Sequence, residues 1–124
     1  MAPNQLGIAY SLGQLGLTKD EKRAAQLYEL SAAQGHAAAQ HNIGTSYYHG
    51  RGVKMDKKKA LLFFKQAAGQ GYASAQCNCG LMYYHGEGVD RDVEEGLRFL
   101  EQGAAQGHQQ SQDALATLRG FLRR

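Results

Sequence analysis

The chain has 124 residues, of which 43% are hydrophobic and 20% are charged, and it contains 16 glycines and carries a formal net charge of +3. This length and composition fit one compact unit and exclude a collagen-like chain, a disordered tail and a large two-domain enzyme. No apolar run approaches the roughly 18 residues of a membrane span, and the first residues lack a secretory signal pattern. The small, mixed charge argues against nucleic-acid binding. We therefore expect a soluble chain that binds neither membrane nor nucleic acid.

The glycines recur with a fixed spacing. Gly35, Gly71 and Gly107 lie 36 residues apart, and the same spacing relates three further pairs: Gly44 and Gly80, Gly50 and Gly86, and Gly52 and Gly88. A period between about 20 and 50 residues is typical of a solenoid, whose units bury their apolar faces only against neighbours. The spacing predicts a single repeat domain over residues 1–124, divided into three repeats and a closing cap helix: residues 1–40, 41–76, 77–112 and 113–124.

Each repeat is predicted to hold two helices. The first copy is a variant, because one extra residue lies within its loop at residues 13–16. In the second copy, apolar residues at helical spacing predict one helix over residues 37–49 and another over residues 56–69. Glycine at position 50 supplies a positive φ angle where the first helix ends, and Asp56 is placed to cap the second helix.

Glycine also occurs inside the predicted helices, at Gly44 and Gly80, where it costs about 1 kcal/mol relative to alanine. We expect a close helix contact to offset this cost. The third copy departs from the second at three positions, where we expect weaker packing: Gly96 replaces Ala60, Leu100 replaces Phe64, and Cys79 replaces Ile43.

Residues 39–53, with the Gly-x-Gly-Val sequence at 50–53 that recurs at 86–89, resemble a Sel1-like repeat, a relative of the tetratricopeptide repeats with a longer turn. The resemblance covers nearly the whole chain. It implies an all-α, right-handed α-solenoid of antiparallel helix pairs, in which the first helices line a concave face. Members of this family generally act as adaptors or scaffolds, so the resemblance implies that a partner peptide or helix binds to the concave face.

A stripe along the first helices is the predicted binding surface. Ala39, Ile43 and Tyr47 face the core, so the opposite stripe is left for solvent or a ligand. Polar and aromatic side chains at matching heights in successive units suit an extended peptide or a helix. We predict partner contacts at eight positions: His41, Asn42, Thr45, Tyr48, Cys77, Asn78, Leu81 and Tyr84.

Two roles remain open for the tyrosines and asparagines of this stripe. Tyr48 and Tyr84 can anchor a partner, since tyrosine is favoured in interfaces, or they can cover the neighbouring helix. The resemblance implies that Asn42 and Asn78, which are equivalent, grip the main chain of a bound peptide. Alternatively, these carboxamides satisfy backbone groups between adjacent repeats.

The only cysteines, Cys77 and Cys79, point to nearly opposite sides of a helix. Cys79 takes a core position, whereas Cys77 shares the outward position of His41, where we expect an exposed thiol. Cysteine-rich relatives staple each helix pair with a disulfide, and that branch includes penicillin binding. This chain lacks their cysteine pattern, which favours a reducing, cytoplasmic compartment and weakens the alternative of a small β-lactam-binding hydrolase.

No sequence typical of a serine hydrolase or a phosphate-binding loop occurs, so we expect no enzyme and no catalytic residue. Equivalent histidines such as His49 and His85 should lie about 10 Å apart, too far to share a zinc ion, so we expect no metal site and no cofactor. The predicted function is that of an adaptor or scaffold. A fragment of a longer scaffold array is the remaining alternative.

Charge is distributed unevenly between the repeats. Residues 41–76 carry six basic side chains and one acidic, whereas residues 77–112 carry two basic and six acidic. The ordinary interpretation is a solvated face on which residues 57–59 meet residues 93–95 of the next unit. A sharper hypothesis is weak self-association through the opposite charge patches, which should weaken as salt rises.

Overall fold

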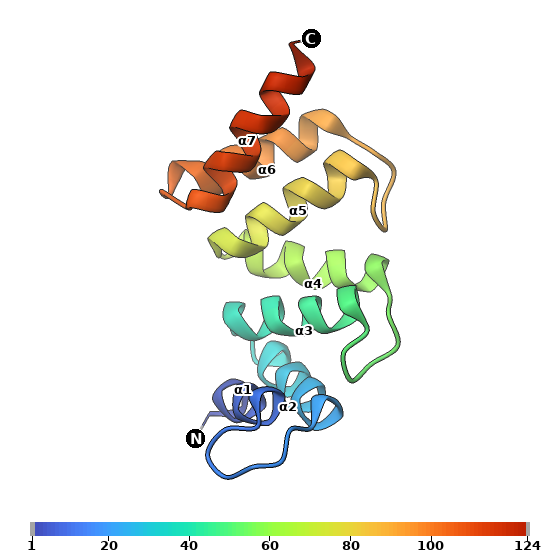
Figure 1. Ribbon diagram of the computed structural model, residues 1–124, viewed down its shortest axis with the longest axis vertical. Helices are drawn as coiled ribbons and strands as arrows, with labels where there is room; N and C mark the ends of the chain where they lie inside the picture. Colours follow the sequence, from blue (N-terminus) through green and yellow to red (C-terminus); the bar gives the residue numbers. More distant parts are fainter. Residues whose placement is uncertain (1, 124) are drawn as a thin grey trace.

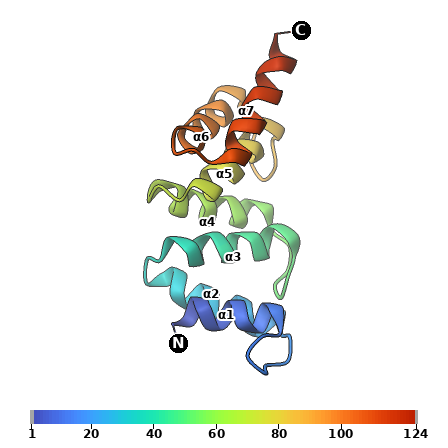
Figure 2. The ribbon, with the colours of Figure 1, turned by 60° about the vertical axis from the view of Figure 1, so that its left-hand side comes forward.

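The computed structural model describes residues 2–123, which form seven helices and no strand. The helices are stacked in chain order, with the two chain ends at opposite ends of the stack (Figure 1, Figure 2). Consecutive helices pack against each other both within and between pairs. This arrangement confirms the predicted all-α solenoid of three helix pairs and a cap helix: α1 (Pro3–Leu12), α2 (Glu21–Ala33), α3 (Ala37–His49), α4 (Lys57–Gly69), α5 (Ala73–His85), α6 (Val93–Ala105) and α7 (Gln109–Leu122).

The second helix of each pair begins with the same cap. Asp20, Asp56 and Asp92 precede α2, α4 and α6, and each carboxylate accepts a 3.0 Å hydrogen bond from the backbone N–H three residues on. This geometry confirms the predicted cap and satisfies one of the free N–H groups at each helix start. At the end of α3, Gly50 has a φ angle of +72°, as its position predicted.

The cap helix begins earlier than predicted. The prediction placed its start at residue 113, but α7 starts at Gln109, because the N–H of Ser111 donates to Nδ1 of His108 and so begins a helical turn. The helix ends at Leu122. Met1 and Arg124, the outer ends of the predicted domain, lie outside the described residues.

Glycines inside α3 and α5 allow close packing within the pairs, as predicted. A Cβ atom at Gly44 would lie 2.8 Å from an aromatic ring of α4 and 3.3 Å from the carbonyl oxygen of Ala60. A Cβ atom at Gly80 would lie only 2.8 Å from the carbonyl oxygen of Gly96. The backbones of α5 and α6 therefore approach each other closely. The prediction of weaker packing in the third pair is wrong: Gly96 lacks the methyl group that Ala60 carries, so the two helices come closer together, and Leu100 and Cys79 are fully buried.

The apolar core runs along the stack in three clusters of buried side chains. The predicted core residues Ala39, Ile43 and Cys79 are fully buried. Tyr47, also predicted to face the core, lies at its edge, where its ring stacks on that of Phe63 with centroids 5.8 Å apart. The core positions therefore follow the predicted helical pattern, and Tyr47 lies at the boundary of the core.

Glutamine side chains add polar contacts within each pair and to the turn that precedes it. Gln70 Nε2 donates to the carbonyl oxygen of Gly35 at 2.9 Å and to Oε1 of Gln40 at 2.8 Å. The equivalent Gln106 makes the same two bonds one repeat later. In each case one bond joins the two helices of a pair and the other reaches the turn that precedes the pair, so these glutamines hold the end of the second helix against the start of the first.

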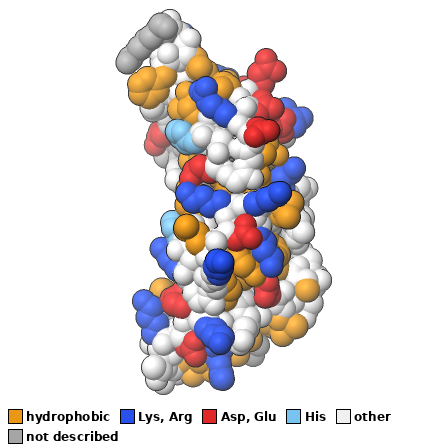
Figure 3. All heavy atoms as spheres, turned by 90° about the vertical axis from the view of Figure 1, so that its right-hand side faces the viewer, with side chains coloured by type: hydrophobic (Ala, Val, Ile, Leu, Met, Phe, Trp, Pro, Cys, Tyr) orange, Lys and Arg blue, Asp and Glu red, His pale blue; other side chains and the backbone are white. Residues whose placement is uncertain are grey.

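The basic second repeat and the acidic third repeat meet through a different contact from the predicted one. Lys57 Nζ lies 2.8 Å from Oε2 of Glu87, in the loop between α5 and α6, and not against residues 93–95. On the face that carries the loops within the pairs, basic and acidic side chains lie side by side along the molecule (Figure 3). Part of the charge asymmetry is thus neutralised within the chain.

Candidate functional site

A cavity of about 310 Å³ opens between α3 and α5, on the side formed by the first helices. Five of the eight predicted partner-binding residues line it: His41, Thr45, Tyr48, Asn78 and Leu81. Four further side chains complete the lining: His49, Phe64, Met82 and Glu87. The predicted stripe and this cavity therefore coincide over most of their length.

The floor of the cavity is apolar. Phe64 comes from α4, and Leu81 and Met82 come from α5; Phe64 and Met82 are each only 2% exposed. His41 packs beside this floor, with its ring 5.6 Å from that of Phe64 and 5.2 Å from that of Tyr72. Burial lowers the pKa of His41, which favours the neutral form of its imidazole.

The asparagines of the first helices hold adjacent repeats together. Asn78 Nδ2 lies 3.0 Å from Nε2 of His41, and the equivalent Asn42 Nδ2 donates to Oδ1 of Asn4 at 2.9 Å. The contacts between repeats that the sequence left as an alternative are therefore present, although the partners are side chains and not backbone groups. Because the neutral His41 ring accepts from the amide, Oδ1 of Asn78 keeps its acceptor capacity.

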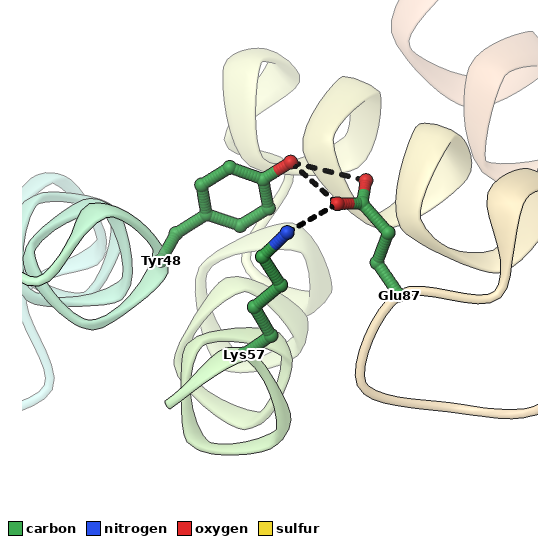
Figure 4. Close-up of polar contacts among 3 residues, drawn as sticks. All are labelled: Tyr48, Lys57 and Glu87. Atoms are coloured by element: carbon green, nitrogen blue, oxygen red, sulfur yellow. Dashed lines mark hydrogen bonds and ion pairs between the residues drawn. The ribbon is translucent and has the colours of Figure 1, made fainter. Parts of the chain in front are cut away.

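A charged cluster lies at the other end of the cavity (Figure 4). The Tyr48 hydroxyl donates to the Glu87 carboxylate, with oxygen separations of 3.0 and 2.8 Å, and Lys57 Nζ lies 2.8 Å from Glu87 and 4.9 Å from the Tyr48 ring centroid. The Lys57 ammonium lowers the pKa of Glu87. Burial, followed by the hydrogen bond to Glu87, raises the pKa of Tyr48. This cluster joins α3, α4 and the loop before α6.

Sequence reasoning missed Glu87, since the partner-binding stripe was traced only along the helices. One signal was available, because Glu87 follows Arg51 by one repeat in the Gly-x-Gly turn and reverses its charge. His49, at the rim, was assigned only to the helix end; burial and the charges of Arg51 and Lys57 lower its pKa.

The comparisons with known proteins agree with this geometry. The sequence matches the Sel1 repeat family over residues 2–36, 37–72 and 73–108. The chain belongs to the Sel1 repeat family. This confirms the resemblance drawn from the glycine spacing and the Gly-x-Gly-Val turns. No curated protein matches the chain.

Several solved structures contain the same Sel1 repeat fold. A protective antigen present in uropathogenic Escherichia coli strains is 35% identical, with a TM-score of 0.91 over 95% of this chain and 26% of that one. A Sel1 repeat protein from Oxalobacter formigenes is 31% identical, with a TM-score of 0.86 over 91% of this chain and 46% of that one. The present chain thus spans about a quarter of the length of the first of these proteins and under half of the length of the second.

Cysteine rich protein B of Helicobacter pylori shares the fold alone, with a TM-score of 0.76, 18% identity, and 92% of each chain covered. In the present Sel1 repeat protein, both cysteines are free and buried. Burial raises the pKa of Cys77 and raises that of Cys79 to about 12. Neither thiol is therefore ionised to a useful extent near neutral pH.

Three predicted site residues of this Sel1 repeat protein lie outside the cavity. Cys77 was predicted to be exposed, and this is wrong: it is 0% exposed, because α7 packs over it with Leu115 and Leu118. Tyr84 packs against the same cluster and lies under the guanidinium of Arg91, 5.0 Å from its ring centroid. Asn42 faces the preceding repeat, where it bonds to Asn4.

Between residues 2 and 123, no group of three or more histidine, cysteine, aspartate or glutamate side chains is arranged to hold a metal ion. In the same part of the chain, no helix combines the length and the apolar character needed to cross a membrane.

Proposed function

We propose that this chain is a protein-interaction module, and that a partner peptide or helix binds along the first helices at the α3–α5 cavity. The observation that carries the proposal is the cavity itself, because an apolar floor flanked by polar side chains is what most binding pockets present. Adaptor or scaffold roles are common for repeat folds of this kind, whose stacked units create extended binding surfaces.

The dimensions of the site suit a polypeptide partner. His41 and Tyr48 are seven residues apart on α3, which corresponds to about 10 Å along the helix axis. The polar groups at the two ends, Asn78 with His41 and Tyr48 with Glu87, are therefore separated by a distance that an extended peptide or one helical face can bridge. Leu81 and Met82 lie between them.

The proposal includes the absence of catalysis. A cysteine nucleophile must be ionised and reachable, whereas burial raises the pKa values of Cys77 and Cys79 and both lie outside the cavity lining. We expect no hydrolysis of a chromogenic β-lactam by the purified chain. Where the chain works as part of a longer array, as the greater lengths of its solved relatives suggest, the same cavity remains the proposed site.

Capture of partners from a lysate of the source organism, with a matched pair of variants, tests this proposal. Thr45 lines the cavity, and its hydroxyl makes only a bond back to the carbonyl oxygen of His41, so Thr45→Arg fills the opening with little structural loss. Thr117→Arg places the same side chain on the exposed surface of α7. We expect the wild type and Thr117→Arg to retain a partner that Thr45→Arg loses, with equal helicity by circular dichroism. Equal retention by all three would refute the site.

A further inference from the structure

The hydrogen-bonding groups around the α3–α5 cavity are unbalanced. The Thr45 hydroxyl proton is used on the carbonyl oxygen of His41, the Tyr48 proton on Glu87, and one amide proton of Asn78 on the neutral His41 ring. What these groups still offer is mainly acceptors, namely Oδ1 of Asn78 and the lone pairs of the two hydroxyl oxygens, against one remaining amide proton of Asn78. The exposed imidazole of His49, at the rim, can either donate or accept a hydrogen bond. The wall therefore favours an occupant that donates hydrogen bonds.

The charges around the cavity favour a neutral occupant. The carboxylate of Glu87 lies in the lining and disfavours an anion. The same carboxylate is already paired with the Lys57 ammonium at 2.8 Å, so a cationic group that approached Glu87 would meet a like charge. A guanidinium or ammonium group is thus a poor fit in spite of the acceptors.

The volume and the floor favour one flat apolar ring. At about 310 Å³, the cavity lies at the lower end of the range of small-molecule sites, roughly 300–1,000 Å³, and has room for a single large side chain. Its floor offers the ring of Phe64 and the thioether of Met82, and both groups pack favourably against an aromatic ring.

We propose that the α3–α5 cavity holds the indole ring of a tryptophan side chain on the bound partner. Indole is neutral and apolar, and its N–H group is a donor without an acceptor, which complements a wall on which free acceptors outnumber free donors. A phenyl ring has no donor, and arginine brings the charge that Lys57 opposes. Tryptophan is also among the residue types enriched at interface anchor positions. This inference rests on the proposed function and adds the chemistry of the anchor.

Methionine methyl resonances allow a direct test with small probes. Met82 lies in the cavity floor, whereas Met55, 59% exposed in the loop between α3 and α4, serves as a control within the same molecule. The full chain, labelled at its methionine methyl carbons, is titrated with N-acetyl-tryptophanamide, with the benzothiophene isostere that replaces the indole N–H by sulfur, and with N-acetyl-argininamide.

We expect the indole probe to shift the Met82 methyl resonance by its ring current, with saturation, and to leave Met55 unchanged. The isostere should bind roughly tenfold more weakly, which corresponds to the loss of one hydrogen bond. The arginine probe should not shift Met82. An unmoved Met82 resonance, equal affinity for the isostere, or preference for the arginine probe would each overturn the proposal.

The two proposals fail in different ways. If Thr45→Arg loses the partner while the indole probe leaves Met82 unmoved, the cavity binds a partner through some other group. If the indole probe shifts Met82 while Thr45→Arg keeps every partner, the cavity binds indole but is not the site at which the partner binds.

Discussion

Two junctions between repeats, α3–α5 (the first junction) and α5–α7 (the second junction), show how equivalent positions on the helices lead to different surfaces. At the first junction, α3 and α5 leave a cavity, and a contact between His41 and Asn78 holds the two helices. At the second junction, α7 packs directly on α5, and the residues at the equivalent positions are Cys77 and Ala114, both smaller. The periodic sequence determines which side chains point away from a pair. Whether they remain exposed depends on the next helix in the stack.

The second junction is closed because α7 departs from the repeat pattern. Where α5 has Asn78, α7 has Ala114, which lets the cap helix settle against the cluster that contains Cys77. Ser111, fully buried near the start of α7, forms a 2.8 Å hydrogen bond between its hydroxyl group and Nδ1 of His108, the residue that precedes α7. Closure of the last unit protects the core that a further repeat would cover.

Among the predicted changes, opening the second junction should lower the free energy of unfolding the most. Leu118 lies in the α7 cluster and is 7% exposed, so Leu118→Ala should lower the free energy of unfolding by about 2–4 kcal/mol. The same change should speed the reaction of Cys77 with a thiol reagent, because α7 detaches more readily. Denaturant unfolding and thiol labelling measure the two effects, and the exposed neighbour Thr117→Ala is the control. A loss of stability without faster labelling would mean that α7 does not gate Cys77.

The close approach of α5 and α6 predicts the next largest effect. Gly80→Ala should cost about 1–3 kcal/mol, because the new Cβ would lie 2.8 Å from the backbone carbonyl of Gly96, which cannot move aside easily. Gly44→Ala should cost less, because its closest neighbour is the side chain of Phe64 and the backbone oxygen of Ala60 is 3.3 Å away. Urea unfolding of the two variants compares them, and an equal or reversed order would contradict the packing difference.

The charged cluster at the cavity predicts a smaller effect that depends on pH. The pKa of Glu87 is lowered in the folded chain, so its contribution is present above the ordinary value of 4.5 and is lost as the pH falls through the folded-state value. Glu87→Gln should therefore lower the free energy of unfolding near neutral pH by at most about 1 kcal/mol, since the cluster is partly solvated. Unfolding curves recorded at several pH values should converge in acid. A difference that persists there would exclude the ion pair as its cause.

Self-association should show the smallest effect. If the basic second repeat and the acidic third repeat attract each other between chains, the apparent mass should fall from low to high salt. The pairing of Lys57 with Glu87 inside one chain limits the charge left for such contacts. Analytical ultracentrifugation in two salt concentrations checks this, and an apparent mass above that of the monomer at both would exclude an electrostatic origin.

The sequence allowed the helices, their caps and the core stripe to be predicted, because these depend on local signals. Asp56 caps α4 because its carboxylate reaches the N–H of Lys59, three residues on, and the burial of Ile43 follows from the helical spacing of its apolar neighbours. The burial of Cys77 could not be predicted in the same way, because α7, which covers it, breaks the repeat pattern.

The polar end of the cavity also depended on contacts between repeats. Glu87 is 39 residues from Tyr48 and 30 from Lys57, so the cluster forms only when the solenoid stacks. The periodicity brought Tyr48 into the predicted stripe, but no local pattern indicated that a turn residue of the next repeat would reach it.

The most direct measurement places a thiol in the first junction and leaves the second unchanged. In the Thr45→Cys variant, the new thiol lies in the cavity lining, whereas Cys77 and Cys79 remain buried. We expect a bulky maleimide to modify one thiol per chain rapidly, and the modified protein to stay helical but no longer to capture its partner. Slow modification at position 45, or capture that survives modification, would contradict the α3–α5 cavity as the binding site.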